Sequence, residues 1–148
     1  MRYFAYGSNM NPRRMRQRGI RFSGRKRAIL EGWRLEFNKV ASRNPEEGYA
    51  NIVEDEKGVV EGVLYEIPDP DIYKLDKYEG YPDHYIRIGV TVKLENGREV
   101  EAVTYVARGD KVRSGLRPSR EYIRHLLRGS DLLSEEYREK LKSWKTLD

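Results

Sequence analysis

The strongest constraint on the fold is a pair of alternating segments joined by a short turn in the second half of the chain. Residues 85–94 (YIRIGVTVKL) and 99–107 (EVEAVTYVA) place apolar side chains at alternating positions, as half-buried strands do. The four residues between them, ENGR, include an Asn-Gly pair, which favours a tight hairpin turn. The sequence therefore predicts an antiparallel hairpin at this place, and a fold built around a β-sheet.

Four further segments, all before this hairpin, have strand character: residues 2–6, 28–38, 49–54 and 59–67. The turn DEKG between the last two predicts a second hairpin. Four segments carry helix start and stop signals: residues 12–18, 68–80, 118–129 and 134–144. Six strands with few helices between them favour an α+β fold. Because so many strands in 148 residues would leave exposed edges, we expect a small mixed-strand barrel-like sheet with a few peripheral helices, in a single domain over residues 1–148.

The composition excludes several classes of site. The chain has no cysteine, so it has no disulfide, thiolate metal site or catalytic thiol, and its two histidines leave little scope for a metal centre. No apolar run is long enough to span a membrane and no signal-peptide core is present, so we expect a cytoplasmic protein without a membrane partner. A charged fraction of 36% and a single glutamine hint at a thermostable protein.

Positive charge is concentrated near the N-terminus. Residues 1–30 carry nine Lys and Arg and no acid, and most of them lie in the Arg-rich stretch 13–27. One interpretation is a patch for nucleic acid or phosphate; the other is a solvated face that Met15, Ile20 and Phe22 anchor to the core. We favour the solvated face and expect no nucleic-acid partner, because no aromatic side chains interleave with the arginines as a base-stacking platform requires.

The first strand runs directly into a Gly-Ser-Asn turn, in the sequence YFAYGSN. A plain hairpin turn is one explanation. The other is a backbone cradle for a small anion, in which successive N–H groups of Gly7, Ser8 and Asn9 converge ahead of a helix that begins near Asn11-Pro12.

Glu79 lies on the expected buried face of the helix 68–80. It follows Ile72 by seven residues and Leu75 by four, whereas Asp71, Lys74, Asp76 and Lys77 are predicted to face water. Burial and the negative end of the helix dipole would both raise the pKa of a carboxyl group there, towards the range of a general acid/base. The alternative is a frayed helix end, with Glu79 in solvent. For Tyr122, spacing alone favours packing against the core.

Taken together, these segments resemble the γ-glutamylcyclotransferase-like family. The resemblance rests on YFAYGSNM, YANI, GVLYEI, LDKYEGY and PSREYI, which occur in the order of the family over nearly the whole chain. It implies a small barrel with packed helices and a reaction without a cofactor. In that reaction the α-amine of a γ-glutamyl compound attacks its own γ-carbonyl, which releases 5-oxoproline and an amine or amino acid.

The same resemblance assigns roles to individual residues. Glu79 matches the catalytic acid/base, and the substrate-binding positions match Tyr6, Gly7, Ser8, Asn9, Tyr85 and Tyr122. The expected partner is a small γ-glutamyl molecule, no metal is expected, and the chain is expected to be a monomer or a weak homodimer. The substrate is left open, as are two other functions: a non-catalytic binding module of the same fold, and a nucleic-acid binder that uses the stretch 13–27.

Overall fold

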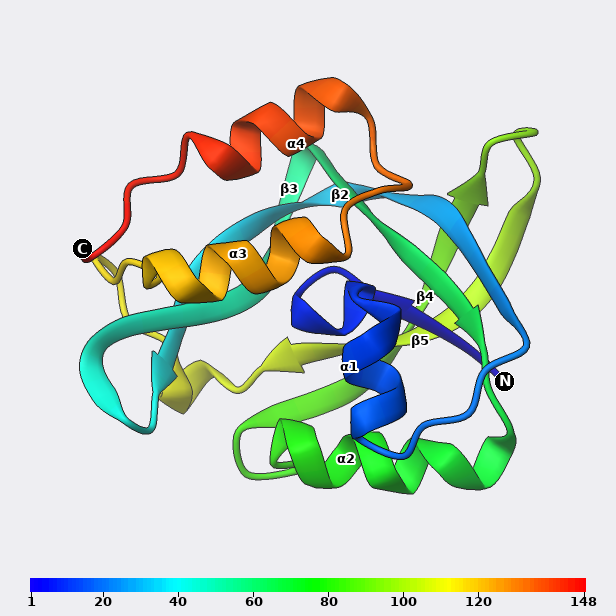
Figure 1. The fold of residues 1–148 in the computed structure, drawn as a ribbon, viewed down its shortest axis with the longest axis horizontal. Helices are drawn as coiled ribbons and strands as arrows, with labels where there is room; N and C mark the ends of the chain where they lie inside the picture. The colour runs from blue at the N-terminus through cyan, green and yellow to red at the C-terminus, as the bar shows by residue number, and fades with distance from the viewer.

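The computed structural model describes residues 1–148 and contains five strands that close into a barrel in the order β1-β3-β2-β4-β5. The strands are β1 (Arg2–Ala5), β2 (Gly24–Ala41), β3 (Asn44–Glu66), β4 (Tyr85–Leu94) and β5 (Glu99–Ala107). Neighbours pair antiparallel except β1 and β5, which close the barrel in parallel at Tyr3 and Val103. Figure 1 shows the helices around this sheet. The mixed barrel-like sheet predicted from the sequence is confirmed.

The longest strands, β2 and β3, form one hairpin whose turn lies at Ser42-Arg43. The hairpin predicted at DEKG is therefore wrong, since residues 49–54 and 59–66 both belong to β3, which continues through the predicted turn. The pairing register shifts between Glu31 and Trp33 of β2, where residues 55–58 of β3 lie opposite a single β2 residue and form a bulge. Gly58 is required there, because a Cβ atom would lie 2.3 Å from the carbonyl oxygen of Trp33.

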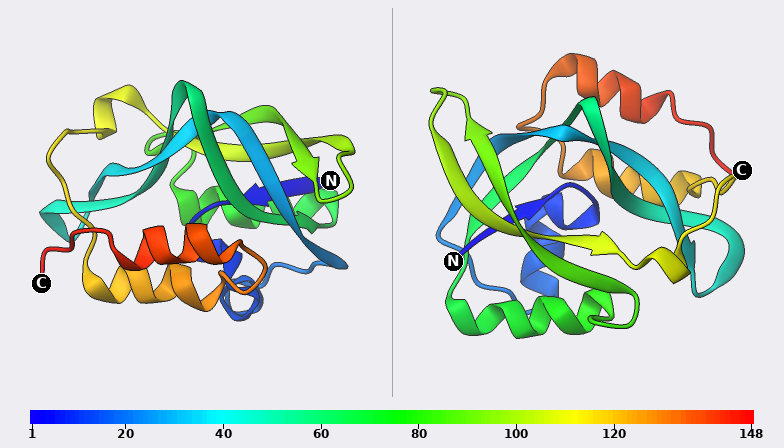
Figure 2. Two further views of the ribbon diagram at one scale, coloured as in Figure 1. Left: turned by 90° about the horizontal axis from the view of Figure 1, so that it is seen from above. Right: turned by 180° about the vertical axis from the view of Figure 1, so that it is seen from behind.

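The hairpin of β4 and β5 has the predicted position, with Tyr85 paired to Ala107 at one end and Lys93 to Glu99 at the other. In Figure 2 these two strands cross the back of the barrel and project beyond it at their turn. Their inward side chains, among them Val92 and Tyr105, are buried in a single apolar core.

Four α-helices surround the barrel: α1 (Pro12–Gln17), α2 (Ile72–Glu79), α3 (Arg120–Arg128) and α4 (Glu135–Lys142). Each lies within a segment predicted to be helical. Side-chain caps are present at three of them, because Asn11 accepts from the backbone N–H of Arg13, Ser119 from that of Tyr122 and Ser134 from that of Tyr137. Figures 1 and 2 show α3 and α4 side by side on one flank and α2 on the opposite flank. None of the helices has the length and apolar character needed to cross a lipid bilayer.

Two carboxylates near α2 depart from the expected pattern. Ile72 and Leu75 are buried as predicted, but Asp71 and Asp76, predicted to face water, are buried as well. Asp71 accepts from the backbone and guanidinium of Arg21. Asp76 accepts a 2.7 Å hydrogen bond from the Tyr105 hydroxyl. Helical periodicity missed both, because their partners come from distant parts of the chain.

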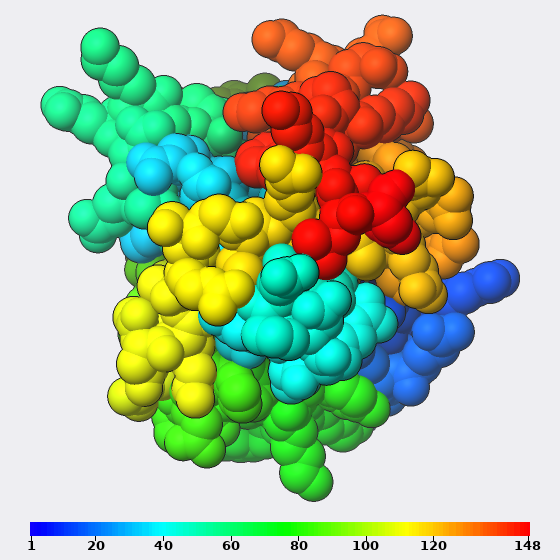
Figure 3. Space-filling model, turned by 90° about the vertical axis from the view of Figure 1, so that its left-hand side faces the viewer, coloured from blue at the N-terminus to red at the C-terminus, as the bar shows by residue number.

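The tip of the β2–β3 hairpin is held by two other segments. The Gly48 N–H donates to the carbonyl of Arg117, and the Arg113 N–H donates to that of Asn38. In Figure 3 the tip, in cyan, packs against the yellow segment that follows β5 and the red C-terminal residues. This anchoring fixes the end of the barrel at which the main cavity opens.

Candidate active site

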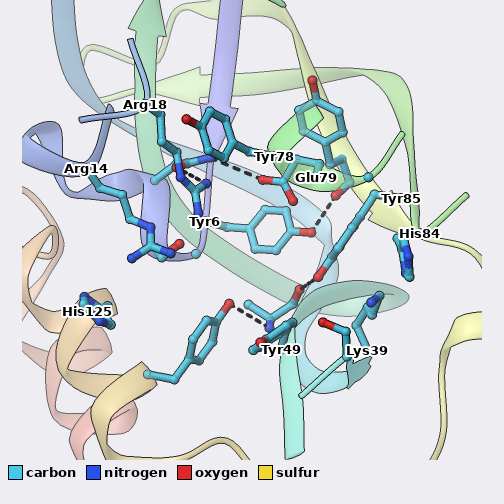
Figure 4. A pocket seen from close by; sticks show the side chains of 18 of the residues that line it. Tyr6, Arg14, Arg18, Lys39, Tyr49, Tyr78, Glu79, His84, Tyr85 and His125 are labelled. Atoms are coloured by element: carbon cyan, nitrogen blue, oxygen red, sulfur yellow. Dashed lines mark hydrogen bonds between the residues drawn. The ribbon is translucent and has the colours of Figure 1, made fainter. Parts of the chain in front are cut away.

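A cavity of about 510 Å³ lies at the end of the barrel where several elements converge. Its walls come from the segment after β1, from α1, the β2–β3 hairpin, the end of α2, the start of β4, and α3. All seven residues expected to form the site line this one cavity: Tyr6, Gly7, Ser8, Asn9, Glu79, Tyr85 and Tyr122. Figure 4 shows Tyr6, Glu79 and Tyr85 together in its central part.

The Gly-Ser-Asn segment forms a tight bend between β1 and α1 and not a hairpin turn. Ser8–Met10 make a short 3₁₀ helix, in which the Met10 N–H donates to the carbonyl of Gly7. The N–H groups of Gly7, Ser8 and Asn9 donate no hydrogen bond within the protein. Such groups at the start of a helical turn favour an anion. This part of the cavity therefore offers unpaired backbone donors to a ligand.

Glu79 is the last residue of α2, and its side chain faces the cavity. Gly80 ends the helix in the left-handed conformation, at φ 66°, where a Cβ atom would also clash with the His84 ring. The alternative of a frayed helix end with Glu79 in bulk solvent is therefore wrong. Burial raises the pKa of Glu79 to about 6, while Arg18, Arg14 and Lys39 act in the opposite direction, with Arg18 the strongest of the three.

Asn9 links Glu79 to one of these cations. Its amide nitrogen donates to a carboxylate oxygen of Glu79 at 3.3 Å and to the Tyr3 hydroxyl at 3.0 Å, and its amide oxygen accepts from Arg18 at 2.9 Å. Every polar atom of this buried side chain thus has a protein partner. Asn9 therefore holds Glu79 in place, and only its backbone N–H is left without a protein partner.

The backbone of Ala50 fixes two of the pocket tyrosines. The Tyr85 hydroxyl donates to the Ala50 carbonyl at 2.8 Å, and the Tyr122 hydroxyl accepts from the Ala50 N–H at 3.1 Å. The proton of Tyr122 is consequently free to be donated to a ligand, whereas that of Tyr85 is engaged. Tyr122 is half-buried beside Tyr49 and Phe37, so it serves both the core and the cavity.

The Arg-rich stretch is not simply a solvated face, and for two of its members that expectation is wrong. Arg14 and Arg18 line the cavity, and the buried Nε of Arg14 has no hydrogen-bond partner. The helix that follows the Gly-Ser-Asn segment presents them at an i, i+4 spacing, which was the available signal. Three other arginines of the stretch form ion pairs with carboxylates on distant segments: Arg21 with Asp71, Arg25 with Asp131 and Arg27 with Glu61.

Sequence analysis also missed Lys39 and His84, at the opposite end of the cavity in Figure 4. Lys39 is buried on β2, where it continues the inward alternation of Leu35 and Phe37. That alternation was a usable signal, because a lysine is rarely found at an inward position of a strand unless it has a partner or a function. Burial and nearby lysines lower the pKa of His84, which favours the neutral ring.

Comparisons with known proteins agree with the fold. Residues 3–124 match the family model "Gamma-glutamyl cyclotransferase, AIG2-like". A γ-glutamylcyclotransferase from Bos taurus is 30% identical over 147 residues, which cover 95% of this chain and 77% of the relative.

Two solved structures extend the similarity to three dimensions. A γ-glutamyl cyclotransferase superposes with a TM-score of 0.88 at 28% identity, over 100% of this chain and 89% of that one. The YkqA protein of Bacillus subtilis gives a TM-score of 0.86 at 31% identity, over 99% and 55% of the two chains. Since the family model spans most of the sequence and the barrel is shared, the chain belongs to the γ-glutamyl cyclotransferase, AIG2-like family.

Proposed function

We propose that the protein is a γ-glutamyl cyclotransferase that uses Glu79 as its general acid/base. The observation that carries this proposal is the placement of Glu79, with a pKa raised to about 6, in the same cavity as the unpaired N–H groups of Gly7–Asn9. A carboxylate of that pKa is ionised at neutral pH and can still return a proton. The family membership supports the same type of reaction.

The substrate supplies the nucleophile. Its α-ammonium group enters protonated, and ionised Glu79 removes one proton. The free amine then attacks the γ-carbonyl carbon of the same molecule and closes a five-membered ring. As the bond between that carbon and the departing nitrogen breaks, Glu79 returns the proton to the nitrogen. The ring nitrogen gives up its second proton to the departing amine, which leaves as an ammonium ion. The products are 5-oxoproline and this protonated amine, so atoms and charge balance without a further reactant.

The bend after β1 is suited to binding the glutamyl head. The N–H groups of Gly7–Asn9 provide donors for the α-carboxylate or for the oxyanion that develops on the γ-carbonyl. Arg14 adds a cation without a protein partner, and Tyr122 adds a hydroxyl donor. Holding the substrate folded for internal attack can contribute on the order of 7–11 kcal/mol, and proton transfer about 10²–10⁴ in rate.

The test is a direct assay. The protein is incubated with a panel of γ-glutamyl amino acids, peptides and amines, and 5-oxoproline is measured by mass spectrometry. We expect turnover of at least one compound, and we expect Glu79→Gln to bind it while turnover falls about 10²- to 10⁴-fold. Glu139→Gln, on the exposed face of α4, is the matched control and should behave as the parent.

Two outcomes would contradict the proposal. If Glu79→Gln released 5-oxoproline at the parental rate, Glu79 would not be the acid/base. If the panel bound without any product, the alternative of a non-catalytic binding module would be favoured. Nucleic-acid binding has less support, because Arg14 and Arg18 face the cavity and Arg21, Arg25 and Arg27 are held in ion pairs.

A further inference from the structure

Lys39 is a buried cation of the cavity that has no carboxylate partner. Only 4% of the residue is exposed, and it takes part in no ion pair. Its ammonium group donates one hydrogen bond, of 2.9 Å, to the backbone carbonyl of its neighbour Val40. An ammonium has three donors, so two remain for other partners. Burying such a charge without a counter-ion is costly, and the fold gains no evident benefit from it.

The surroundings of Lys39 are suited to an anion. The ring centroids of Tyr49 and Tyr85 lie 5.9 and 5.8 Å from its ammonium nitrogen. Burial and repulsion from Lys111 both lower the pKa of Lys39. On the same side, His84 has a buried Nδ1 without a partner. A carboxylate bound at this end would satisfy an unpaired ammonium and relieve the repulsion between two lysines.

The position of Lys39 relative to Glu79 indicates which part of a substrate would reach it. Figure 4 shows Arg14 and Arg18 on one side of Glu79 and Tyr6, and Lys39 on the other. Of these three cations, Lys39 has the weakest effect on the pKa of Glu79. A glutamyl head bound at Gly7–Asn9 would place the scissile bond near Glu79. The leaving part of the molecule would then extend along Tyr85 towards Lys39.

We propose that Lys39 is a specificity-determining residue, whose ammonium binds a carboxylate carried by the leaving amine. This inference rests on the proposed function and narrows its substrate class. The preferred substrates are γ-glutamyl compounds whose leaving amine is itself a carboxylic acid. γ-Glutamylamines, which have no anionic group at that end, are poor substrates because they leave the ammonium of Lys39 unpaired.

Two compounds that differ in one carboxylate test the inference: γ-glutamylalanine and γ-glutamylethylamide. We expect the parental protein to prefer γ-glutamylalanine about 10- to 100-fold in kcat/KM, the range of a charge-assisted hydrogen bond. Lys39→Met keeps the length of the side chain and removes the charge. It should lower the ratio of kcat/KM for γ-glutamylalanine to kcat/KM for γ-glutamylethylamide by that factor. Lys39→Arg should retain most of the preference.

Lys111→Gln is the matched control, because it removes a nearby positive charge that does not line the cavity. It should leave the preference within about twofold of the parental ratio. A loss of preference in Lys111→Gln as large as that in Lys39→Met would indicate a general field effect and overturn the specific role of Lys39. Circular dichroism and thermal unfolding establish that each variant is folded.

The outcomes separate this inference from the proposed function. If the parental protein converts both compounds equally well, the specificity role proposed for Lys39 is wrong and the proposed function stands. If neither compound yields 5-oxoproline, the proposed function fails for these substrates. The carboxylate contact of Lys39 is then tested by measuring the binding of the same two compounds calorimetrically. Tighter binding of γ-glutamylalanine that Lys39→Met abolishes would support the carboxylate contact. Equal binding, or none, would overturn it.

Discussion

At one end of the cavity Arg18 donates to Asn9, which in turn donates to Glu79; at the other, Lys39 donates only to the carbonyl of its own neighbour. Both ends carry positive charge next to tyrosine rings. Arg18 is held by a side chain that also contacts Glu79, whereas Lys39 has only a backbone carbonyl as its hydrogen-bond partner. We expect the cation tied to Glu79 through Asn9 to orient the proposed acid/base, and the cation without a side-chain partner to be available to a ligand.

The largest expected difference between the two ends comes from removing Asn9. Asn9→Ala breaks the only hydrogen bond to Glu79, so the carboxylate loses its fixed orientation. We expect kcat to fall about 10- to 100-fold with little change in KM, because a small misplacement of a catalytic group is costly. Steady-state kinetics with γ-glutamylethylamide give the comparison. With this substrate Lys39→Met should retain kcat within about twofold.

An equal loss of kcat in the two variants would contradict the distinction between the ends. A rise in KM without a change in kcat for Asn9→Ala would assign Asn9 to substrate binding in place of orienting Glu79. Thermal unfolding of Asn9→Ala is needed beside the kinetics, because Asn9 is buried and also contacts Tyr3.

The second prediction concerns the stability cost of a carboxylate in this cavity. The pKa of Glu79 is raised to about 6 from an ordinary value of 4.5, so the folded state binds this proton more tightly than the unfolded state. Glu79 is therefore neutral in both states at pH 4, and above pH 6 it lowers the unfolding free energy by about 2 kcal/mol. Glu79→Gln should raise the unfolding free energy by that amount at pH 7.5 and leave it unchanged at pH 4.

Urea unfolding of the parent and Glu79→Gln at both pH values measures this difference. Glu139→Gln, which removes an exposed carboxylate of α4, should change little at either pH. A destabilised Glu79→Gln at pH 7.5 would mean that the contacts with Asn9 and the arginines outweigh the cost of burial.

The two ends also differ in how far the sequence predicts them. Glu79 follows Ile72 and Leu75 at helical spacing, and Gly80 closes the helix, so local periodicity is enough to place it. Arg18 acquires its role through Asn9, nine residues earlier, and through α2, which is sixty residues away. Such contacts depend on how distant segments dock. Two local signals were overlooked: the i, i+4 spacing of Arg14 and Arg18, and the inward alternation after Phe37 that places Lys39 in the cavity.

The same contrast applies to the strands. The hairpin of β4 and β5 is predictable because its Asn-Gly turn and both alternating segments are contiguous. The DEKG segment is also turn-like, yet it lies inside β3, where pairing with β2 and the bulge near Trp33 determine its path. A turn signal alone does not reveal that a partner strand is long enough to pair along both sides of it.

The smallest expected effect is a shift in the acid limb of the plot of kcat/KM against pH. Glu79 must be ionised to accept a proton, so kcat/KM should fall below about pH 6 as its pKa is crossed. A nearby cation lowers that pKa, so removing one raises it and moves the limb to higher pH. Arg18→Gln should shift the limb upward by on the order of half a pH unit, and Lys39→Met by less, because Arg18 is the stronger of the two influences.

Profiles measured with γ-glutamylethylamide separate this effect from the contact that we propose for Lys39, because that substrate offers no carboxylate to the ammonium. Any shift in Lys39→Met then reports only the field of its charge at Glu79. If the limb moved further in Lys39→Met than in Arg18→Gln, the stronger influence on the pKa of Glu79 would come from the Lys39 end of the cavity. In that case Lys39 would act on Glu79 directly. It would then be wrong that one end of the cavity orients Glu79 while the other binds the leaving part of the substrate.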